Sequence, residues 1–173
     1  MQVLLENHVD GLLLETFYDL EEAVLAAKLA RKLTDEALIV NVSLGEIGVL
    51  NGGIPVSDAF EQLIAAGADV VGLNCRMVRT ICYAHLNQYL CRNKPICRLI
   101  RMPACPTIEM AAFFYNSNPD YFANMGVKFI EQGVRLLGGC CGTTPEQIKA
   151  FAKVAKNREP ITEKKGKAIG RFR

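Results

Sequence analysis

The sequence GGCCGTT at residues 138–144 places two adjacent cysteines between glycines, after a short apolar run and before a helix start. Adjacent cysteines bond to each other poorly, because a native disulfide holds its Cα atoms about 4.4–6.8 Å apart with a relaxed dihedral angle. Such a pair at a strand end is better suited to holding a soft metal ion. A catalytic zinc site uses three protein ligands and leaves a fourth position open. The motif therefore predicts a third cysteine in a similar setting.

The sequence GLNC at residues 72–75 supplies that third cysteine at the end of another apolar run. Strand ends at one rim of a parallel sheet can bring Cys75, Cys140 and Cys141 together across the chain. Three thiolates would suit Zn²⁺, which would keep an incoming fourth thiol deprotonated near neutral pH while its sulfur stays nucleophilic. Two alternatives stay open: three small buried cysteines beside tight turns, or a vicinal-cysteine redox protein.

Two polar residues are expected at the same rim. Glu15 ends a run of three leucines, and its carboxylate could bind a substrate ammonium group or simply belong to a strand-to-helix turn. Asn74 precedes Cys75 and could fix the ligand loop by hydrogen bonds, as residues around metal ligands often do, or could be a turn former. The residues alone leave both alternatives open for Glu15 and for Asn74.

The other cysteines lack metal-ligand spacing. Cys82 and Cys91 are expected in a helix and Cys97 in a strand, so packing is the better interpretation for these three. Cys105 falls in a loop and has no assigned role.

Composition favours an intracellular globular chain. Half of the 173 residues are hydrophobic, and no stretch approaches the ~18 apolar residues of a membrane span. Seven cysteines without framework spacing argue against a secreted disulfide scaffold and favour the cytoplasm.

Charge is distributed unevenly along the chain. Residues 153–173 hold eight Lys/Arg against two Asp/Glu, which leaves 12 basic and 16 acidic residues in the rest. The tail shows no apolar periodicity and reads as a linker. It also lacks the interleaved aromatics of a nucleic-acid surface. We therefore expect no nucleic-acid or membrane partner.

Strands and helices are predicted to alternate along the body. Apolar runs predict strands at residues 11–15, 37–43, 69–73, 95–100 and 134–137. Caps and periodicity predict helices at residues 19–33, 57–66, 78–90, 119–132 and 145–156. Residues 102–118 are expected to be irregular. This rhythm indicates an α/β fold with a parallel sheet, either doubly wound or part of a (β/α)₈ barrel. Because a whole barrel needs eight units and about 250 residues, these five units would be an incomplete one.

Three motifs together resemble the homocysteine S-methyltransferase (homocysteine-binding) domain family. They are DGLLLETF at residues 10–17, GAD leading into GLNC at 67–75, and GVR leading into GGCCGTTP at 133–145. The last motif is highly specific, and the resemblance covers residues 6–155. It implies a TIM barrel, of which this chain would be the C-terminal portion.

The resemblance also implies a chemistry. Zinc would be held by Cys75, Cys140 and Cys141 with homocysteine sulfur as the fourth ligand, and Glu15 would bind the homocysteine amino group. The thiolate would take a methyl group from a donor to give methionine. The donor stays open among methyltetrahydrofolate, S-methylmethionine, S-adenosylmethionine and betaine.

The chain departs from the family pattern in two places. The opening segment, with its early strands and an Asp-Gly-rich loop that contacts substrate, is absent. The Pro-Asn-Ala/Ser-type loop after the seventh strand reads MPACP at residues 102–106. We therefore expect a partial homocysteine-binding barrel domain at residues 1–156 and a basic linker or tail at 157–173.

The departures leave two functions in view. One is the zinc-bearing part of an enzyme that is inactive alone. The other is a non-catalytic zinc-binding fragment or subunit that needs a separate N-terminal half. Residues 115–122 and 160–164 look most like bacterial bifunctional proteins, in which this domain precedes a methylenetetrahydrofolate reductase domain.

Overall fold

The structure is a computed structural model, and it describes residues 1–45, 48–75, 97–102, 106–109, 112–115 and 118–159. The predicted helix at 78–90 lies outside these residues, as do Cys82, Cys91, Cys105 and the end of the tail. The elements in chain order are α1 (Gln2–Glu6), β1 (Gly11–Phe17), α2 (Leu20–Leu33), β2 (Ala37–Val42), a 3₁₀ turn (Asn51–Gly53), α3 (Val56–Ala65), β3 (Val70–Asn74), β4 (Cys97–Met102), β5 (Pro106–Glu109), β6 (Ala112–Tyr115), α5 (Pro119–Glu131), β7 (Leu136–Gly139) and α6 (Pro145–Ala155).

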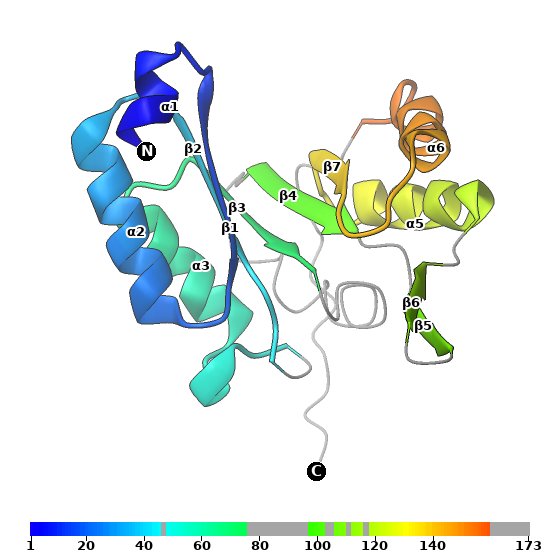
Figure 1. Cartoon of the computed structure of the whole chain (residues 1–173), viewed down its shortest axis with the longest axis horizontal. Coiled ribbons are helices and arrows are strands. Elements are labelled where there is room, and N and C mark those ends of the chain that lie inside the picture. The colour runs from blue at the N-terminus through cyan, green and yellow to red at the C-terminus, as the bar shows by residue number, and fades with distance from the viewer. Residues whose placement is uncertain (46–47, 76–96, 103–105, 110–111, 116–117, 160–173) are drawn as a thin grey trace.

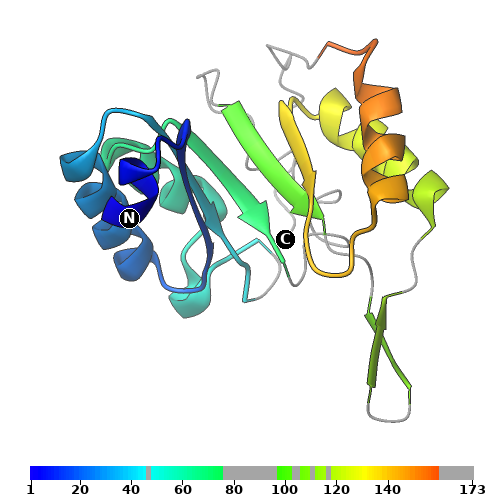
Figure 2. The same cartoon turned by 45° about the horizontal axis from the view of Figure 1, so that its top comes forward.

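Five strands form one sheet in the order β1-β2-β3-β4-β7, and every neighbouring pair is parallel. The order follows the chain without the reversal that defines a doubly wound sheet. The sheet curves, with α2 and α3 outside its first strands and α5 and α6 outside its last (Figures 1 and 2). All five strands therefore direct their C-terminal ends toward one rim.

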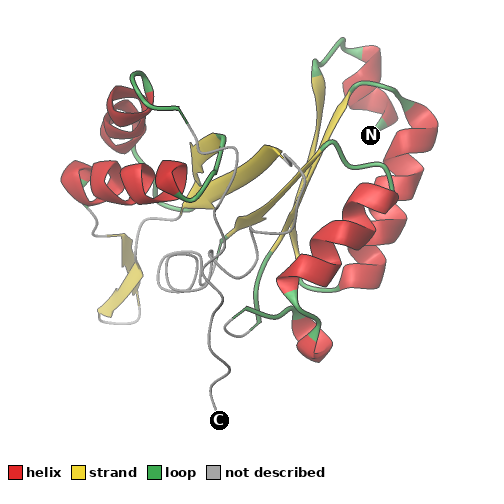
Figure 3. Ribbon diagram, turned by 180° about the vertical axis from the view of Figure 1, so that it is seen from behind, coloured by secondary structure: helices red, strands yellow, loops and turns green. Residues whose placement is uncertain are grey.

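The core lies between the first three strands and the helices α2 and α3, which run side by side (Figure 3). Ala23, Ala27 and Ala30 are fully buried on α2, and these small side chains bring the helix close to β1 and β2. The strand residues of this core alternate along each strand: Leu12, Leu38, Val40, Val42, Val71 and Leu73.

Because strand side chains alternate between faces, the residues between these core positions lie on the opposite side of the sheet. We call that side the inner face, and its residues on the first three strands are Leu13, Glu15, Ile39, Asn41, Val70, Gly72 and Asn74. Ser43, the residue directly after β2, continues the alternation, since its N–H still donates to the Phe17 carbonyl of β1. The strand pairing supports this assignment, since Ile39 is level with both Leu13 and Val70.

Local signals explain where α2 and α3 begin and end. The Asp19 carboxylate accepts a hydrogen bond from the Glu22 backbone N–H and caps the start of α2. Gly67, at φ +106°, ends the turn after α3. Arg31 donates two hydrogen bonds to the Gly67 carbonyl and pairs with Asp69 at 2.6 Å. Arg31 thus ties the end of α2 to the start of β3.

The C-terminal half is held by the packing of α5 on α6. The rings of Phe122 and Phe151 lie 5.1 Å apart. Gly126 permits this approach, because a Cβ there would lie 2.8 Å from Phe151 Cδ1. Helix α6 in turn contacts β7, so this helix pair supports the last strand.

Three local predictions differ from the structure. Residues 102–118 are not wholly irregular, because β5 and β6 pair as an antiparallel hairpin set apart from the main sheet (Figure 2). The last strand is β7 at Leu136–Gly139 rather than 134–137, since Gly138 and Gly139 pair with β4. Helix α1 was not predicted, and its five residues include none that is buried. No helix in the described part of the chain is long and apolar enough to cross a bilayer.

Candidate metal centre

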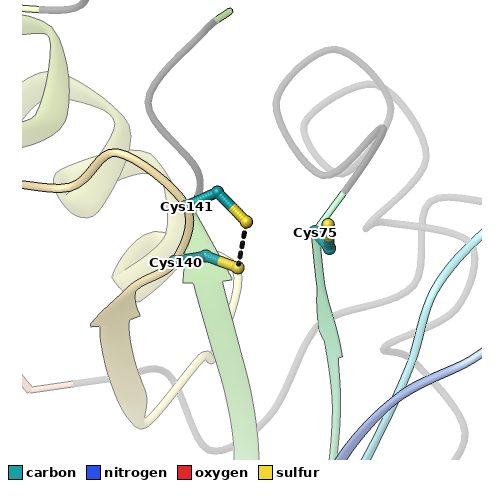
Figure 4. A group of neighbouring side chains, drawn as sticks. All are labelled: Cys75, Cys140 and Cys141. Atoms are coloured by element: carbon teal, nitrogen blue, oxygen red, sulfur yellow. Dashed lines mark hydrogen bonds between the residues drawn. The ribbon is translucent and has the colours of Figure 1, made fainter. Parts of the chain in front are cut away.

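Three cysteine thiols meet at the C-terminal rim of the sheet. Cys75 follows β3, while Cys140 and Cys141 follow β7, and the three sulfurs all lie within 4.8 Å of one another. The sulfurs of Cys140 and Cys141 are 3.8 Å apart, and both lie on the side that faces Cys75 (Figure 4). All three thiols are free, with Cys75 and Cys140 half-buried and Cys141 exposed.

This spacing fits one tetrahedral zinc ion. Zinc–sulfur bonds of about 2.3 Å in a tetrahedron place neighbouring sulfurs about 3.8 Å apart. The Cys140–Cys141 separation already has that value, and small rotations of the Cys75 side chain would close the remainder. Three sulfurs supply three of four positions and leave one open, as in catalytic rather than structural zinc sites.

The turn after β7 is built to present two consecutive sulfurs. The Cys140 backbone N–H donates to Thr143 Oγ1 at 3.0 Å, and the Thr143 N–H donates back to the Cys140 carbonyl at 3.1 Å. Gly142 takes a left-handed conformation at φ +69°. Gly139 leaves room for the Thr143 side chain, which a Cβ at position 139 would strike. Gly139 and Gly142 are thus required by the turn.

The end of β3 is held in an unusual conformation. Cys75 has φ +62°, a conformation that residues other than glycine seldom adopt and that costs about 1–3 kcal/mol. Directly before it, the buried Asn74 side chain reaches across to the end of β1. Its amide donates to Thr16 Oγ1 at 2.7 Å, and its oxygen accepts from the Thr16 backbone N–H at 3.0 Å. Asn74 therefore joins two strand ends next to the cysteine cluster.

Glu15 is joined to this arrangement through the same amide. Asn74 Nδ2 lies 3.4 Å from Glu15 Oε2, and Glu15 is exposed on the inner face. Thr16, at φ +69°, sits where the pairing of β1 with β2 is irregular. At this irregularity in β1, the Glu15 carboxylate lies beside the residue that precedes Cys75.

One thiol of the cluster, that of Cys141, is harder to ionise than an ordinary cysteine. The pKa of Cys141 is raised from 9.0 to about 11, chiefly because its thiol is withdrawn from water although the residue is exposed overall. A hydrogen bond to Cys140 and repulsion from the Cys140 and Cys75 thiolates add to the effect. Cys141 in the chain alone therefore favours the neutral thiol, and a divalent cation beside its sulfur would reverse that preference.

The structure brings together the predicted Cys75, Cys140 and Cys141, and it places Glu15 and Asn74 in contact at the same rim. Sequence reasoning missed Thr143 and Thr16. Thr143 could have been found, because threonine after a Cys-Gly turn can accept a backbone hydrogen bond. Thr16 could not, since its partner is 58 residues away.

Comparison with known proteins places this site in context. The sequence model described as "Homocysteine S-methyltransferase" matches residues 1–155. Betaine–homocysteine S-methyltransferase 1 of Mus musculus is 29% identical over an alignment of 190 positions, which covers 96% of this chain and 46% of that protein. Methionine synthase of Mycobacterium leprae (strain TN) is 28% identical over 86% of this chain and 13% of that protein.

Solved structures agree on the fold. The apo form of the homocysteine methyltransferase MmuM from Escherichia coli superposes with a TM-score of 0.71 at 22% identity, covering 88% of this chain and 52% of that one. Its metallated form gives a TM-score of 0.70, covering 90% and 48%. The chain thus spans about half the length of MmuM and of the mouse enzyme. The extent of the sequence match shows that the chain belongs to the homocysteine S-methyltransferase family.

Proposed function

We propose that this chain carries the zinc-binding part of a homocysteine S-methyltransferase. One observation carries the proposal: three thiols from two strand ends converge with the spacing of a tetrahedral zinc site that has one open position. The bound ion would lower the pKa of an incoming thiol so that it is deprotonated near neutral pH. A reducing, cytoplasmic setting, which keeps the three cysteines as thiols, belongs to this proposal.

Each residue of the site has a distinct part in the reaction. Cys75, Cys140 and Cys141 would hold the ion, and Glu15 would bind the ammonium group of homocysteine. Asn74 fixes the ends of β1 and β3 relative to each other through its contacts with Thr16 and Glu15. The homocysteine sulfur then attacks the methyl group of a donor. A sulfur–carbon bond forms as the donor–methyl bond breaks, and the thiol proton passes to solvent.

The chain is proposed to be the C-terminal portion of a (β/α)₈ barrel. Its strands follow chain order and leave β1 and β7 as edges among the described strands. About half of the mouse and E. coli proteins lies outside the match. A separate or preceding N-terminal half would close the barrel and complete the substrate pocket. The same coverage favours a second candidate, a zinc-binding subunit without activity of its own.

The proposal also names a methyl donor. Likeness to the bifunctional bacterial proteins, carried by residues 115–122 and 160–164, favours a methyltetrahydrofolate donor and a downstream reductase domain. Betaine, S-methylmethionine and S-adenosylmethionine are the competing donors.

Methionine formation tests the proposal. The chain should make no methionine from homocysteine with any of the four donors, and should gain activity when mixed with a matching N-terminal half. Correct orientation can account for about 7–11 kcal/mol of a barrier, so an incomplete clamp should lower the rate by several orders of magnitude. Glu15→Ala in the reconstituted protein should weaken homocysteine binding and leave the zinc content unchanged.

Two results would count against this reading. Substantial methionine formation by the 173-residue chain would show that no second half is required. A zinc-loaded, reconstituted protein that uses none of the donors would leave only the non-catalytic candidate.

A further inference from the structure

Two buried polar side chains lie in β2 and directly after it, on the side of the inner face. Asn41 and Ser43 are both fully buried. Within the described part of the chain, neither amide atom of Asn41 nor the hydroxyl of Ser43 has a hydrogen-bond partner. Buried polar atoms nearly always have a partner, and one without a partner lowers stability. Two such residues, two positions apart at the C-terminal end of one strand, call for a ligand that satisfies them.

Their place in the sheet puts them beside the candidate metal centre. Asn41 is level with Gly72 of β3. Ser43 is one residue beyond the pairing of Val42 with Leu73, so it is level with Asn74. Adjacent strands are about 4.8 Å apart. The unpaired groups therefore lie one strand away from the residue before Cys75.

Asn74 provides a comparison within the same face. It is as buried as Asn41, yet both ends of its amide are hydrogen-bonded to the end of β1. At this rim, residues of the sheet can therefore supply the hydrogen bonds that a buried amide needs. Asn41 and Ser43 are left unsatisfied although they lie on the same face and close to the same strand end.

We propose that Asn41 and Ser43 bind the carboxylate of the amino acid whose thiol enters the cysteine cluster. The inference rests on the proposed function and goes further, because it assigns the third polar group of that substrate. The Asn41 Nδ2–H and the Ser43 O–H are two donors, which a carboxylate accepts with its two oxygens. Glu15 takes the ammonium group and the cluster takes the sulfur. The three contacts together select an α-amino acid with a thiol side chain.

The proposal predicts opposite effects on stability and on binding. Ser43→Ala and Asn41→Leu remove polar atoms that have no partner and keep the approximate volume. Without an added thiol ligand, such substitutions should leave the Tm of the chain unchanged or raise it. A structural role for these atoms would lower the Tm instead. Ser57→Ala, the same change near the start of α3, serves as the matched control.

Binding is measured on the chain loaded with Co²⁺, whose visible absorption changes when a further thiolate becomes a ligand. Two thiols are titrated: homocysteine, and 3-aminopropane-1-thiol, which lacks only the carboxylate. The parent should bind homocysteine more tightly. Each variant should bind homocysteine about tenfold more weakly, because hydrogen bonds to charged groups are strong. Affinity for 3-aminopropane-1-thiol should not change.

Several results would overturn the inference and leave the proposed function intact. The parent could bind the two thiols with equal affinity. The variants could lose equal affinity for both thiols, keep the parent's affinity for homocysteine, or have a lowered Tm. A parent protein whose cobalt spectrum responds to neither thiol would instead contradict the proposed function and, with it, this assignment.

Discussion

At the scale of single residues, the cysteine cluster combines groups that repel one another once ionised. Burial and the neighbouring sulfurs raise the pKa of Cys141 to about 11. A cation that binds three thiolates must displace their protons, so its affinity depends on pH. The cluster is therefore best tested through its metal content and through its titration.

Metal content should depend on each side of the cluster. The folded, reduced chain should hold about one zinc ion, and Cys75→Ala or Cys140→Ala should abolish it, because two remaining thiolates do not make a tight site. Metal analysis after gel filtration measures this. Cys82→Ala, at a cysteine that lacks metal-ligand spacing in the sequence, is the control. Zinc-free parent protein, or variants that retain the ion, would contradict the metal assignment.

The titration of Cys141 should appear in the stability of the metal-free chain. Its folded pKa lies above the ordinary value of 9.0, so its contribution to stability is complete below pH 9 and is lost as pH rises toward 11. The free energy of unfolding, from denaturant titration, should fall over this window more steeply in the parent than in Cys141→Ser. Zinc should remove the difference between pH 9 and pH 11 in the parent. Parallel pH profiles for parent and variant would contradict the assignment.

At the scale of elements, apolar runs predicted the body of the sheet well. Strands β1, β2 and β3 and helices α2, α3, α5 and α6 lie within a few residues of the predicted ranges, because burial and capping act locally. The limits of β7 were missed, since its last residues are glycines whose strand conformation comes from pairing with β4. The β5–β6 hairpin was missed because proline and loop residues concealed it.

The turn after β7 offers an element-scale test. In Gly139→Ala the new Cβ would strike Thr143 Cγ2 and Cβ and approach Ile148 Cδ1 at 3.0 Å. The turn would shift and move both sulfurs, so zinc affinity should fall about 10- to 100-fold, as for other residues that orient metal ligands. Competition with a chelator of known affinity gives the value.

A second substitution separates the collision from other effects. Thr143→Ser keeps the hydroxyl that accepts from Cys140 N–H and removes the methyl that collides. Added to Gly139→Ala, it should restore part of the affinity. A double variant no better than Gly139→Ala would show that the collision is not the cause.

At the scale of the whole molecule, the sheet is open at both ends within the described strands. Leu13 on β1 is 41% exposed and Leu136 on β7 is 37% exposed. Unpaired edges with apolar side chains favour association between copies.

Topology also explains what could be predicted of the site: strand ends of a parallel sheet share a rim, so the cysteines were expected together. Asn41 and Ser43 were not, because only the three-dimensional arrangement shows that they lack partners.

The isolated chain should therefore self-associate. Sedimentation at micromolar concentration should show dimers or larger species, and Leu136→Lys should shift the distribution toward monomer, because a charge on an edge strand discourages pairing. Glu61→Lys, on the exposed side of α3, controls for the added charge. A sharp monomer with cooperative melting in the parent would favour a self-sufficient open sheet.

The two sides of the cluster come from distant parts of the chain, since Cys75 and Cys140 are 65 residues apart (140 minus 75). During synthesis, at roughly 5–20 residues per second, Cys75 leaves the ribosome about 3–13 seconds before its partners. Until β7 has paired with β4, no partial set of ligands can compete for zinc with the thiols of the cell. Metal uptake thus comes at the end of folding, and in a zinc-loaded molecule β3 and β7 are already in their final positions in the sheet.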